Sequence, residues 1–256
     1  MGSVYIFLIV LYLLYMLINS RGVVIKTTKY GDTSVISHIL TEAKGLRSFI
    51  VNGVRTRKAA MPLVLFQPGT VLDLQMYSND QKKLLRLKEA KPHYVWTRIA
   101  FDIKRSSLTL FISELIQKTI HETEENQLLF NEILRYLLYI DNSTNSISNI
   151  PLHFLINLSR YLGFQPQGHF DTETPCFDLF DGSFCLYPNT IHFLKADLSE
   201  QLSKLMEVEL EDLHTIQLSK DTRRKLLEEL LHYYKLHIEN FPNIRSHEVF
   251  HSIMEI

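Results

Sequence analysis

The sequence has very few cysteines and lacks the short motifs that several common enzyme classes need. Only Cys176 and Cys185 are present among 256 residues, so no disulfide framework holds the fold and a reducing compartment is favoured. They form no CxxC pair, and we expect buried apolar side chains rather than ligands or nucleophiles. There is no Walker phosphate loop, no G-x-S-x-G and no dinucleotide-binding fingerprint. We therefore expect neither an enzyme activity nor a cofactor.

The chain also has almost no net charge, because 27 Lys and Arg balance 28 Asp and Glu. This balance is uneven along the sequence. Residues 21–91 carry 13 Lys and Arg against 5 Asp and Glu, which gives a net charge of +8. Residues 170–256 carry 8 Lys and Arg against 16 Asp and Glu, which gives a net charge of −8. Such polarity predicts a basic module that meets a polyanion and an acidic module with a different task.

The apolar run from Val4 to Ile18 is too short for an ordinary membrane span. It has about fifteen residues, whereas a spanning helix needs roughly 20, and neither a preceding cation nor a small-residue cleavage site marks a signal peptide. Two interpretations stay open. The run is a short anchor with Arg21, Lys26 and Lys29 on the cytoplasmic side, or translation begins at Met16 and the preceding residues are an upstream extension. We favour the extension, because Met16 leads directly into a predicted strand.

Short alternating segments separated by glycine-containing turns predict five strands in the first third of the chain. These segments are residues 22–28, 33–41, 70–77 and 83–91, together with one that starts at Gly45. Five short strands within about 70 residues fit a small closed barrel of the OB type better than a sandwich, which usually needs about seven. We predict an OB-fold domain over residues 16–92.

After Pro92 the apolar residues recur at three- and four-residue spacing, which predicts helices. The predicted helices span residues 99–120, 124–140, 151–161, 199–206, 221–238 and 246–254. The predicted fold class is therefore α+β and multi-domain, with an N-terminal OB-fold β-barrel followed by an all-α helical domain. Residues 1–15 form an apolar leader, and residues 93–256 form the helical domain. Its irregular insertion at about 165–190 contains a hairpin around Asp181 and Gly182.

A basic turn after the third predicted strand is the centre of the candidate site. Arg55, Arg57 and Lys58 fall within four positions, and because like charges repel, their proximity favours an anionic partner over a solvated loop. An OB barrel binds single strands with cations on the phosphates and aromatic rings under the bases. The candidate nucleic-acid-binding residues are Lys26, Lys29, Lys44, Arg47, Phe49, Arg55, Arg57, Lys58, Lys82, Lys83, Arg86 and Lys88.

Four aromatic residues, Tyr30, Phe49, Phe66 and Tyr77, are candidate stacking platforms. We expect about half of them to fill the barrel, since the interiors of small barrels take large side chains. No base-reading pattern is present, so binding should be largely indifferent to base sequence and should weaken as salt rises.

A match to H-E-x-x-H runs from His247 to His251. On a helix the two imidazoles share one face and can bind zinc, with Glu248 as the base. The chain extends only five residues further, and Val249 and Phe250 are typical packing residues. We therefore favour an ordinary terminal helix and expect no metal site.

Taken together, these residues resemble the RecO family of bacterial DNA repair and recombination mediators, from about Met16 to the end. The matching segments are Arg21–Ile25, Tyr30–Ser34, Gly45–Arg55 with Lys58, Leu65–Pro68, Phe101–Ser107, Leu158–Pro166 and Ile244–Ser246. The family also starts where Met16 stands, which supports the interpretation of the leader as an extension.

The resemblance implies an N-terminal OB-fold and a helical C-terminal domain. It also implies binding to single- and double-stranded DNA without sequence specificity, annealing of complementary strands and a cytoplasmic place at the nucleoid. The implied partners are the acidic tail of single-strand-binding protein, RecR and, indirectly, RecA, which the protein helps to load. A membrane is the less favoured partner.

Many members of the family carry a four-cysteine zinc site after the Leu-Gly-Phe-x-Pro turn. In this sequence Pro166 is followed by Gln-Gly-His, and Cys185 marks at most one former ligand position. The hairpin from Asp178 to Gly182 is therefore expected to be held by packing alone.

Two functions of other classes remain as alternatives. One is a membrane-anchored OB-fold interaction protein, whose basic barrel meets anionic lipid or an acidic protein tail. The other is a metallohydrolase centred on His247 and His251. The DNA repair and recombination mediator is the preferred hypothesis.

Overall fold

A computed structural model describes residues 17–77, 82–121 and 124–246. The chain divides into a barrel unit, made of residues 1–96 and 120–135, and a helical unit, made of residues 97–119 and 136–256. The predicted α+β fold class, with an OB-like barrel followed by a helical region, is confirmed. Each unit is described by itself below.

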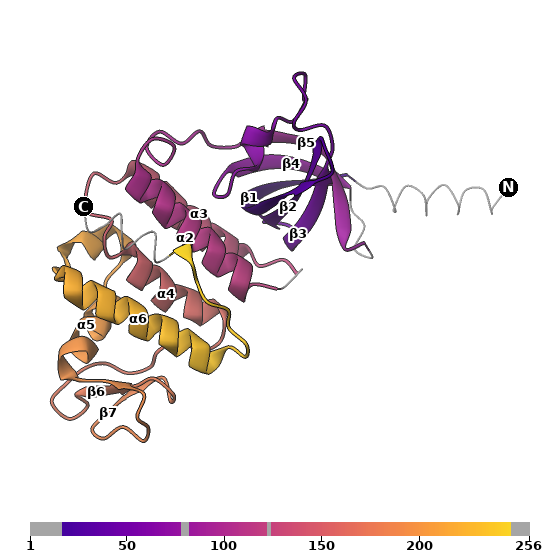
Figure 1. Cartoon of the computed structure of the whole chain (residues 1–256). Coiled ribbons are helices and arrows are strands. Elements are labelled where there is room, and N and C mark those ends of the chain that lie inside the picture. Colours follow the sequence, from indigo (N-terminus) through magenta and orange to yellow (C-terminus); the bar gives the residue numbers. More distant parts are fainter. Residues whose placement is uncertain (1–16, 78–81, 122–123, 247–256) are drawn as a thin grey trace. The chain divides into compact units, whose positions relative to one another are not determined.

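Five strands close into a barrel in the order β1-β2-β3-β5-β4, which Figure 1 shows in indigo and violet. The strands are β1 (Leu17–Tyr30), β2 (Ser34–Thr41), β3 (Gly45–Val51), β4 (Val71–Tyr77) and β5 (Leu84–Pro92). All neighbours are antiparallel except β3 and β5, which run parallel. All five strands predicted from the sequence are present.

Strand β1 closes the barrel because it pairs with β4 along its first half and with β2 along its second half. The change of partner occurs at Gly22. A Cβ at this position would lie 2.5 Å from Leu74 Cδ1 and 2.7 Å from Ile39 Cγ2, so glycine lets the strand bend tightly over the core.

The chain between β3 and β4 seals one end of the barrel. Val54 is 3% exposed and Phe66 is 1% exposed, and both pack in the core with Val24, Ile39 and Leu72. Phe66 ends a short 3-10 helix, η1 (Leu63–Phe66). Because Val54 and Phe66 are held in the core, the loop between them starts and ends at fixed positions on the barrel.

The helical unit is built on five helices. They are α2 (Ile103–Thr119), α3 (Gln127–Asn142, whose last residues belong to this unit), α4 (Ile150–Tyr161), α5 (Ala196–Glu207) and α6 (Lys220–His237). These match five predicted helices, although α2 begins four residues later than expected. Helix α4, with nine buried residues, packs against α2, α5 and α6 and forms the centre of the unit.

The insertion after α4 contains the predicted hairpin and a third short strand. Strands β6 (Cys176–Asp178), β7 (Ser183–Cys185) and β8 (Phe193–Leu194) form a small sheet, of which β6 and β7 are labelled in Figure 1.

Contrary to expectation, this hairpin is not held by packing alone. The buried Asp178 carboxylate accepts hydrogen bonds from the N–H groups of Phe180, Asp181 and Asn189 at 2.9, 3.2 and 3.0 Å. A carboxylate that accepts several backbone donors orders a loop without a metal. Cys176 and Cys185 are half-buried, free and directly opposed in the sheet.

Three expectations lie outside the described residues, namely the apolar leader of residues 1–15, the predicted helix beyond Ser246 and the His247–His251 pair. Among the described residues, no helix is both long and apolar enough to cross a membrane. Within the same residues, His, Cys, Asp and Glu side chains form no group of three that could hold a metal ion.

Candidate nucleic-acid interface

One outward side of the barrel brings together residues of β1, β2, β3 and β5. Directly opposed residues of neighbouring strands point to the same side of a sheet, so the register defines rows. One row contains Lys26, His38, Ser48 and Leu84, and the next contains Thr28, Ile36, Ile50 and Arg86. The residues between the two rows include Phe49 and Leu85, which are buried in the core. We call the eight row residues, with Tyr30 at the end of β1, the basic face.

The basic face has cations at its sides and no Asp or Glu at any of its positions. Lys26 on β1 and Arg86 on β5 flank the half-buried Ile36 and Ile50 in the middle of the face. Lys88, exposed two residues beyond Arg86, extends the charge along β5. Cations beside a partly apolar centre suit a single strand, because phosphates contact the cations while bases cover the apolar side chains.

A basic loop follows β3 and carries the exposed residues Arg55, Arg57 and Lys58. The backbone N–H of Arg55 donates to the carbonyl of Thr33 at 3.3 Å. The loop therefore begins beside the β1–β2 turn, close to the end of β1 where Tyr30 is 51% exposed. Because the buried Val54 anchors its first residue, the loop adds three cations at this end of the basic face.

His38 lies in the middle of the basic face. Its Nδ1 is 2.9 Å from Ser48 Oγ, and it directly opposes Lys26. Burial, and then the charge of Lys26, lower the pKa of His38 below its ordinary value of 6.5. At neutral pH this imidazole is therefore uncharged, and acidification adds a cation to the face.

The remaining predicted cations lie elsewhere on the barrel. Lys29 is exposed at the end of β1, near the basic loop, but opposes Val35 rather than a residue of the basic face. Lys44 lies in the β2–β3 turn, and Arg47 Nε donates to its carbonyl at 3.1 Å. That turn is at the opposite end of β3 from the basic loop. Lys82 and Lys83 are exposed just before β5, at the end of that strand beside Ser48.

The prediction that Phe49 binds nucleic acid is wrong. Phe49 is 0% exposed in the barrel core, because it alternates with the outward Ser48 and Ile50 along β3. Phe66 is likewise a core residue, whereas Tyr30 is exposed and Tyr77 is half-buried. The expectation that about half of the four aromatic residues fill the barrel is confirmed.

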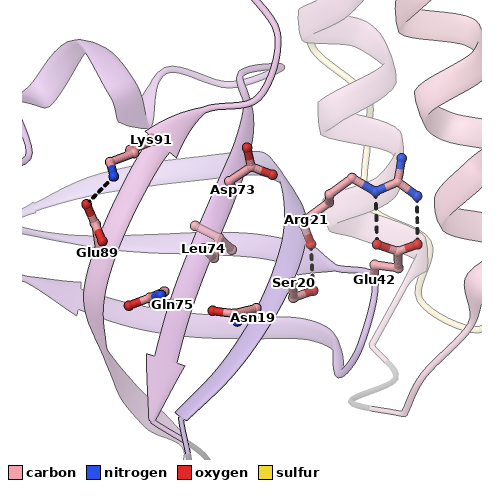
Figure 2. Close-up of a pocket in the computed structure, with 9 residues that line it drawn as sticks. All are labelled: Asn19, Ser20, Arg21, Glu42, Asp73, Leu74, Gln75, Glu89 and Lys91. Atoms are coloured by element: carbon pink, nitrogen blue, oxygen red, sulfur yellow. Dashed lines mark hydrogen bonds and ion pairs between the residues drawn. The ribbon is translucent and has the colours of Figure 1, made fainter.

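A second outward side of the barrel carries charges of both signs. Arg21 on β1 opposes Asp73 on β4, which opposes Lys91 on β5, and Glu89 precedes Lys91 by two residues. All five residues line a hollow of about 470 Å³. Figure 2 shows the Arg21–Glu42 pair at one side of these residues and the Glu89–Lys91 pair at the other. We call Arg21, Glu42, Asp73, Glu89 and Lys91 the paired face.

Ion pairs compensate the charges of the paired face. Arg21 donates from Nε and Nη2 to Glu42 at 2.9 and 2.6 Å, and this bonding lowers the pKa of the Glu42 carboxyl below its ordinary value of 4.5. Lys91 Nζ lies 2.7 Å from Glu89. A cation beside a carboxylate attracts a polyanion far less than an isolated cation does. The basic face is therefore the stronger candidate for a nucleic-acid surface.

Comparisons with known proteins match the barrel region and the helical region to the two parts of one protein family. The model of the recombination protein O N-terminal region matches residues 16–96, and that of its C-terminal region matches residues 100–246. The chain belongs to the RecO family. It is 33% identical to the DNA repair protein RecO of Phocaeicola vulgatus, covering 91% of this chain and 98% of the relative. It is 31% identical to RecO of Bacteroides fragilis, covering 94% and 100%.

Membership of the RecO family confirms the resemblance and makes this chain a member of a family of DNA repair proteins. The sequence had not indicated that Ile36, His38, Ser48 and Ile50 belong to the candidate basic face of the RecO-family barrel. The signal was the period-two alternation along β2 and β3, which separates inward from outward positions. That alternation places Phe49 on the opposite side of β3 from Ser48 and Ile50, but it does not say which side faces the core.

Proposed function

We propose that this RecO-family protein is a DNA repair and recombination mediator that holds DNA across the basic face and the basic loop. The observation that carries the proposal is the set of outward cations without carboxylates, arranged around Ile36 and Ile50. Phosphate contacts of this kind give affinity without sequence specificity. Both single- and double-stranded DNA are ligands, because both present phosphates.

Strand annealing follows from the same electrostatics. Two complementary strands repel each other through their phosphates, and cations that neutralise part of this charge lower the barrier to pairing. The protein needs no bond-making residue for this task, because it only holds strands that pair by themselves. We therefore propose annealing, rather than an enzymatic step, as the activity of the barrel.

Residues of the helical unit supply a candidate site for the acidic tail of single-strand-binding protein. A hollow of about 520 Å³ has the apolar Leu231, Phe241 and Ile244 in its lining and the exposed Lys235 and Arg245 beside them. Glu228 also lines the hollow, so its two cations outnumber one carboxylate. An apolar floor with a surplus of cations suits an acidic peptide that carries apolar residues. RecR is the further proposed partner, and the result is loading of RecA onto coated strands at the nucleoid.

The DNA proposal is tested with a labelled oligonucleotide titrated at about 0.05 and 0.2 M salt against wild type and Arg55→Ala/Arg57→Ala/Lys58→Ala. The variant should bind about tenfold more weakly at the lower salt. Its salt slope should be shallower by about 0.7 for each phosphate that the variant no longer neutralises. Identical curves would remove the basic loop from the site.

A matched control removes three other cations. Lys204→Ala/Arg224→Ala/Lys225→Ala takes the same charge from exposed residues of the helical unit that are ion-paired with Glu200 or Asp221. Equal weakening in this control would mean that net charge, and not the basic loop, governs binding.

The tail proposal has its own experiment. A synthetic peptide with the tail's acidic and apolar residues should bind wild type, and it should bind Lys235→Ala/Arg245→Ala about tenfold more weakly because two charged partners are removed. Lys204→Ala serves as the control. Unchanged peptide affinity in the double variant would exclude this hollow.

A further inference from the structure

Two aliphatic side chains are exposed directly after the basic loop. Leu63 is 38% exposed and Val64 is 60% exposed, and they begin the 3-10 helix η1. Single exposed aliphatic residues are common on protein surfaces. An adjacent pair held beside three cations is a more specific arrangement.

The pair stands on a fixed base. Phe66 is buried in the barrel core, and Leu65 and Met61 pack against the same core. The backbone N–H of Leu63 donates to the carbonyl of Val54 at 3.1 Å, and Val54 is itself a core residue. Leu63 and Val64 therefore project from a segment that is anchored on both sides, and little ordering is needed when they bind.

The same hydrogen bond brings the pair close to the first cation of the basic loop. Arg55 follows Val54 directly, and its N–H donates to Thr33 in the β1–β2 turn. The aliphatic pair, the basic loop and the β1–β2 turn thus meet at one end of the barrel. Asp32 in the turn is exposed, and the three cations of the basic loop outnumber its single carboxylate. A ligand at this end therefore meets a surplus of positive charge together with apolar surface.

A single strand has complementary chemistry, because its phosphates alternate with bases whose faces are open. A continuous duplex has the same phosphates, but its base faces are covered by stacking. Aliphatic side chains inserted at a step gain apolar packing only where the bases are already unstacked or can be unstacked at a cost.

We propose that Leu63 and Val64 form an apolar tip that packs against unstacked bases while the basic loop holds the neighbouring phosphates. The tip gives this end of the barrel a preference for single strands and duplex ends over continuous duplex. This inference rests on the proposed DNA-binding function and names the strand type that the site selects.

The test compares wild type with Leu63→Ser/Val64→Ser on a labelled single strand and on a closed hairpin duplex. Removal of the apolar side chains should weaken single-strand binding about tenfold. Duplex binding should change less than about twofold, and the salt slopes should stay as in wild type because no charge is removed. Val64→Ser alone, at the more exposed position, should weaken single-strand binding about threefold. This single variant keeps the test valid if the double variant does not fold.

Val95→Ser is the matched control, because Val95 is 76% exposed on the same unit and lies outside the basic loop. It should bind both ligands as wild type does. Equal weakening for single strand and duplex in the double and single variants would overturn the inference, and so would unchanged binding of both, as expected for a pair that touches a protein instead.

The failure of this inference is distinguishable from failure of the proposed function. If Arg55→Ala/Arg57→Ala/Lys58→Ala weakens binding and the serine variants do not, only the apolar tip is refuted. If the triple variant also binds as wild type does, the proposed DNA site at this end of the barrel is refuted as well.

Discussion

The basic face and the paired face lie on one barrel, and each contains two strand cations. Lys26 and Arg86 have no carboxylate among the positions of their face, whereas Arg21 and Lys91 share theirs with Glu42, Asp73 and Glu89. The number of cations therefore does not distinguish the two surfaces. The two surfaces differ in whether nearby carboxylates neutralise the cations, because a polyanion responds to the electrostatic field that remains after local ion pairing.

The largest effect is expected from reversing charge on the basic face. Lys26→Glu/Arg86→Glu should weaken DNA binding about 100-fold near 0.1 M salt, because two phosphate contacts become repulsive. Fluorescence anisotropy with a labelled oligonucleotide measures this change. Lys91→Glu places one reversal on the paired face and should change affinity less than about threefold. If each reversed charge weakened DNA binding equally on both faces, the proposed difference between the basic face and the paired face would be refuted.

A smaller effect should come from the exposed ring at the end of the basic face. Tyr30→Ala should reduce single-strand affinity about tenfold, because one stacked base is worth roughly 1 to 3 kcal/mol. Tyr30→Phe keeps the ring and should restore binding to within about twofold. Quenching of a fluorescent base analogue by wild type and by Tyr30→Phe, but not by Tyr30→Ala, would report the stack directly.

The contrast between the two faces was only partly readable from the sequence. The strands and the basic loop were predictable, since alternation and glycine turns are local signals. The rows were not, because they depend on the register between strands. Arg86 lies directly opposite Ile50 in the parallel β3–β5 pair, although these residues are 36 positions apart in the sequence. Likewise, the Arg21–Asp73–Lys91 row needs β1, β4 and β5 to be neighbours.

Two further details show where local reasoning ends. The residue type of Phe49 suits a stacking ring, and only the choice of which side of β3 faces the core excludes that role. Asp178 could not be identified as the organiser of its hairpin, because its partners include Asn189, eleven residues away. In both places a tertiary contact decides the role of a residue whose type alone allows several.

The paired face should contribute to stability rather than to DNA affinity. Glu42→Gln removes the bidentate partner of Arg21 and should lower the free energy of unfolding by about 1 kcal/mol at pH 7, the scale of a partly exposed ion pair. DNA affinity should stay within about twofold, because Asp73 and Glu89 still compensate the face. Urea denaturation and anisotropy measure the two quantities, and a large gain in DNA affinity would contradict this account.

The acid dependence of this ion pair has a defined sign. Arg21 lowers the folded-state pKa of Glu42 below 4.5, so the pair's stabilisation is complete above about pH 4.5 and is lost as pH falls through the folded-state pKa. The difference in unfolding free energy between wild type and Glu42→Gln should shrink over that acidic window. A difference that stays constant from pH 7 to pH 3 would mean that the ionised carboxylate is not its source.

The smallest expected effect is a pH dependence that only the basic face should have. His38 has a pKa below 6.5 in the free protein, and a phosphate nearby favours the protonated ring, so its pKa rises when DNA binds. Affinity should therefore increase as pH falls below about 6.5, by about threefold at pH 5.5.

His38→Gln should remove this increase while keeping a polar partner for Ser48. The protonated ring is disfavoured in the free fold, so the stability of wild type also decreases in the same window, and thermal midpoints at each pH must confirm that the protein stays folded. A pH dependence that persists in His38→Gln would move the titrating group away from the centre of the basic face.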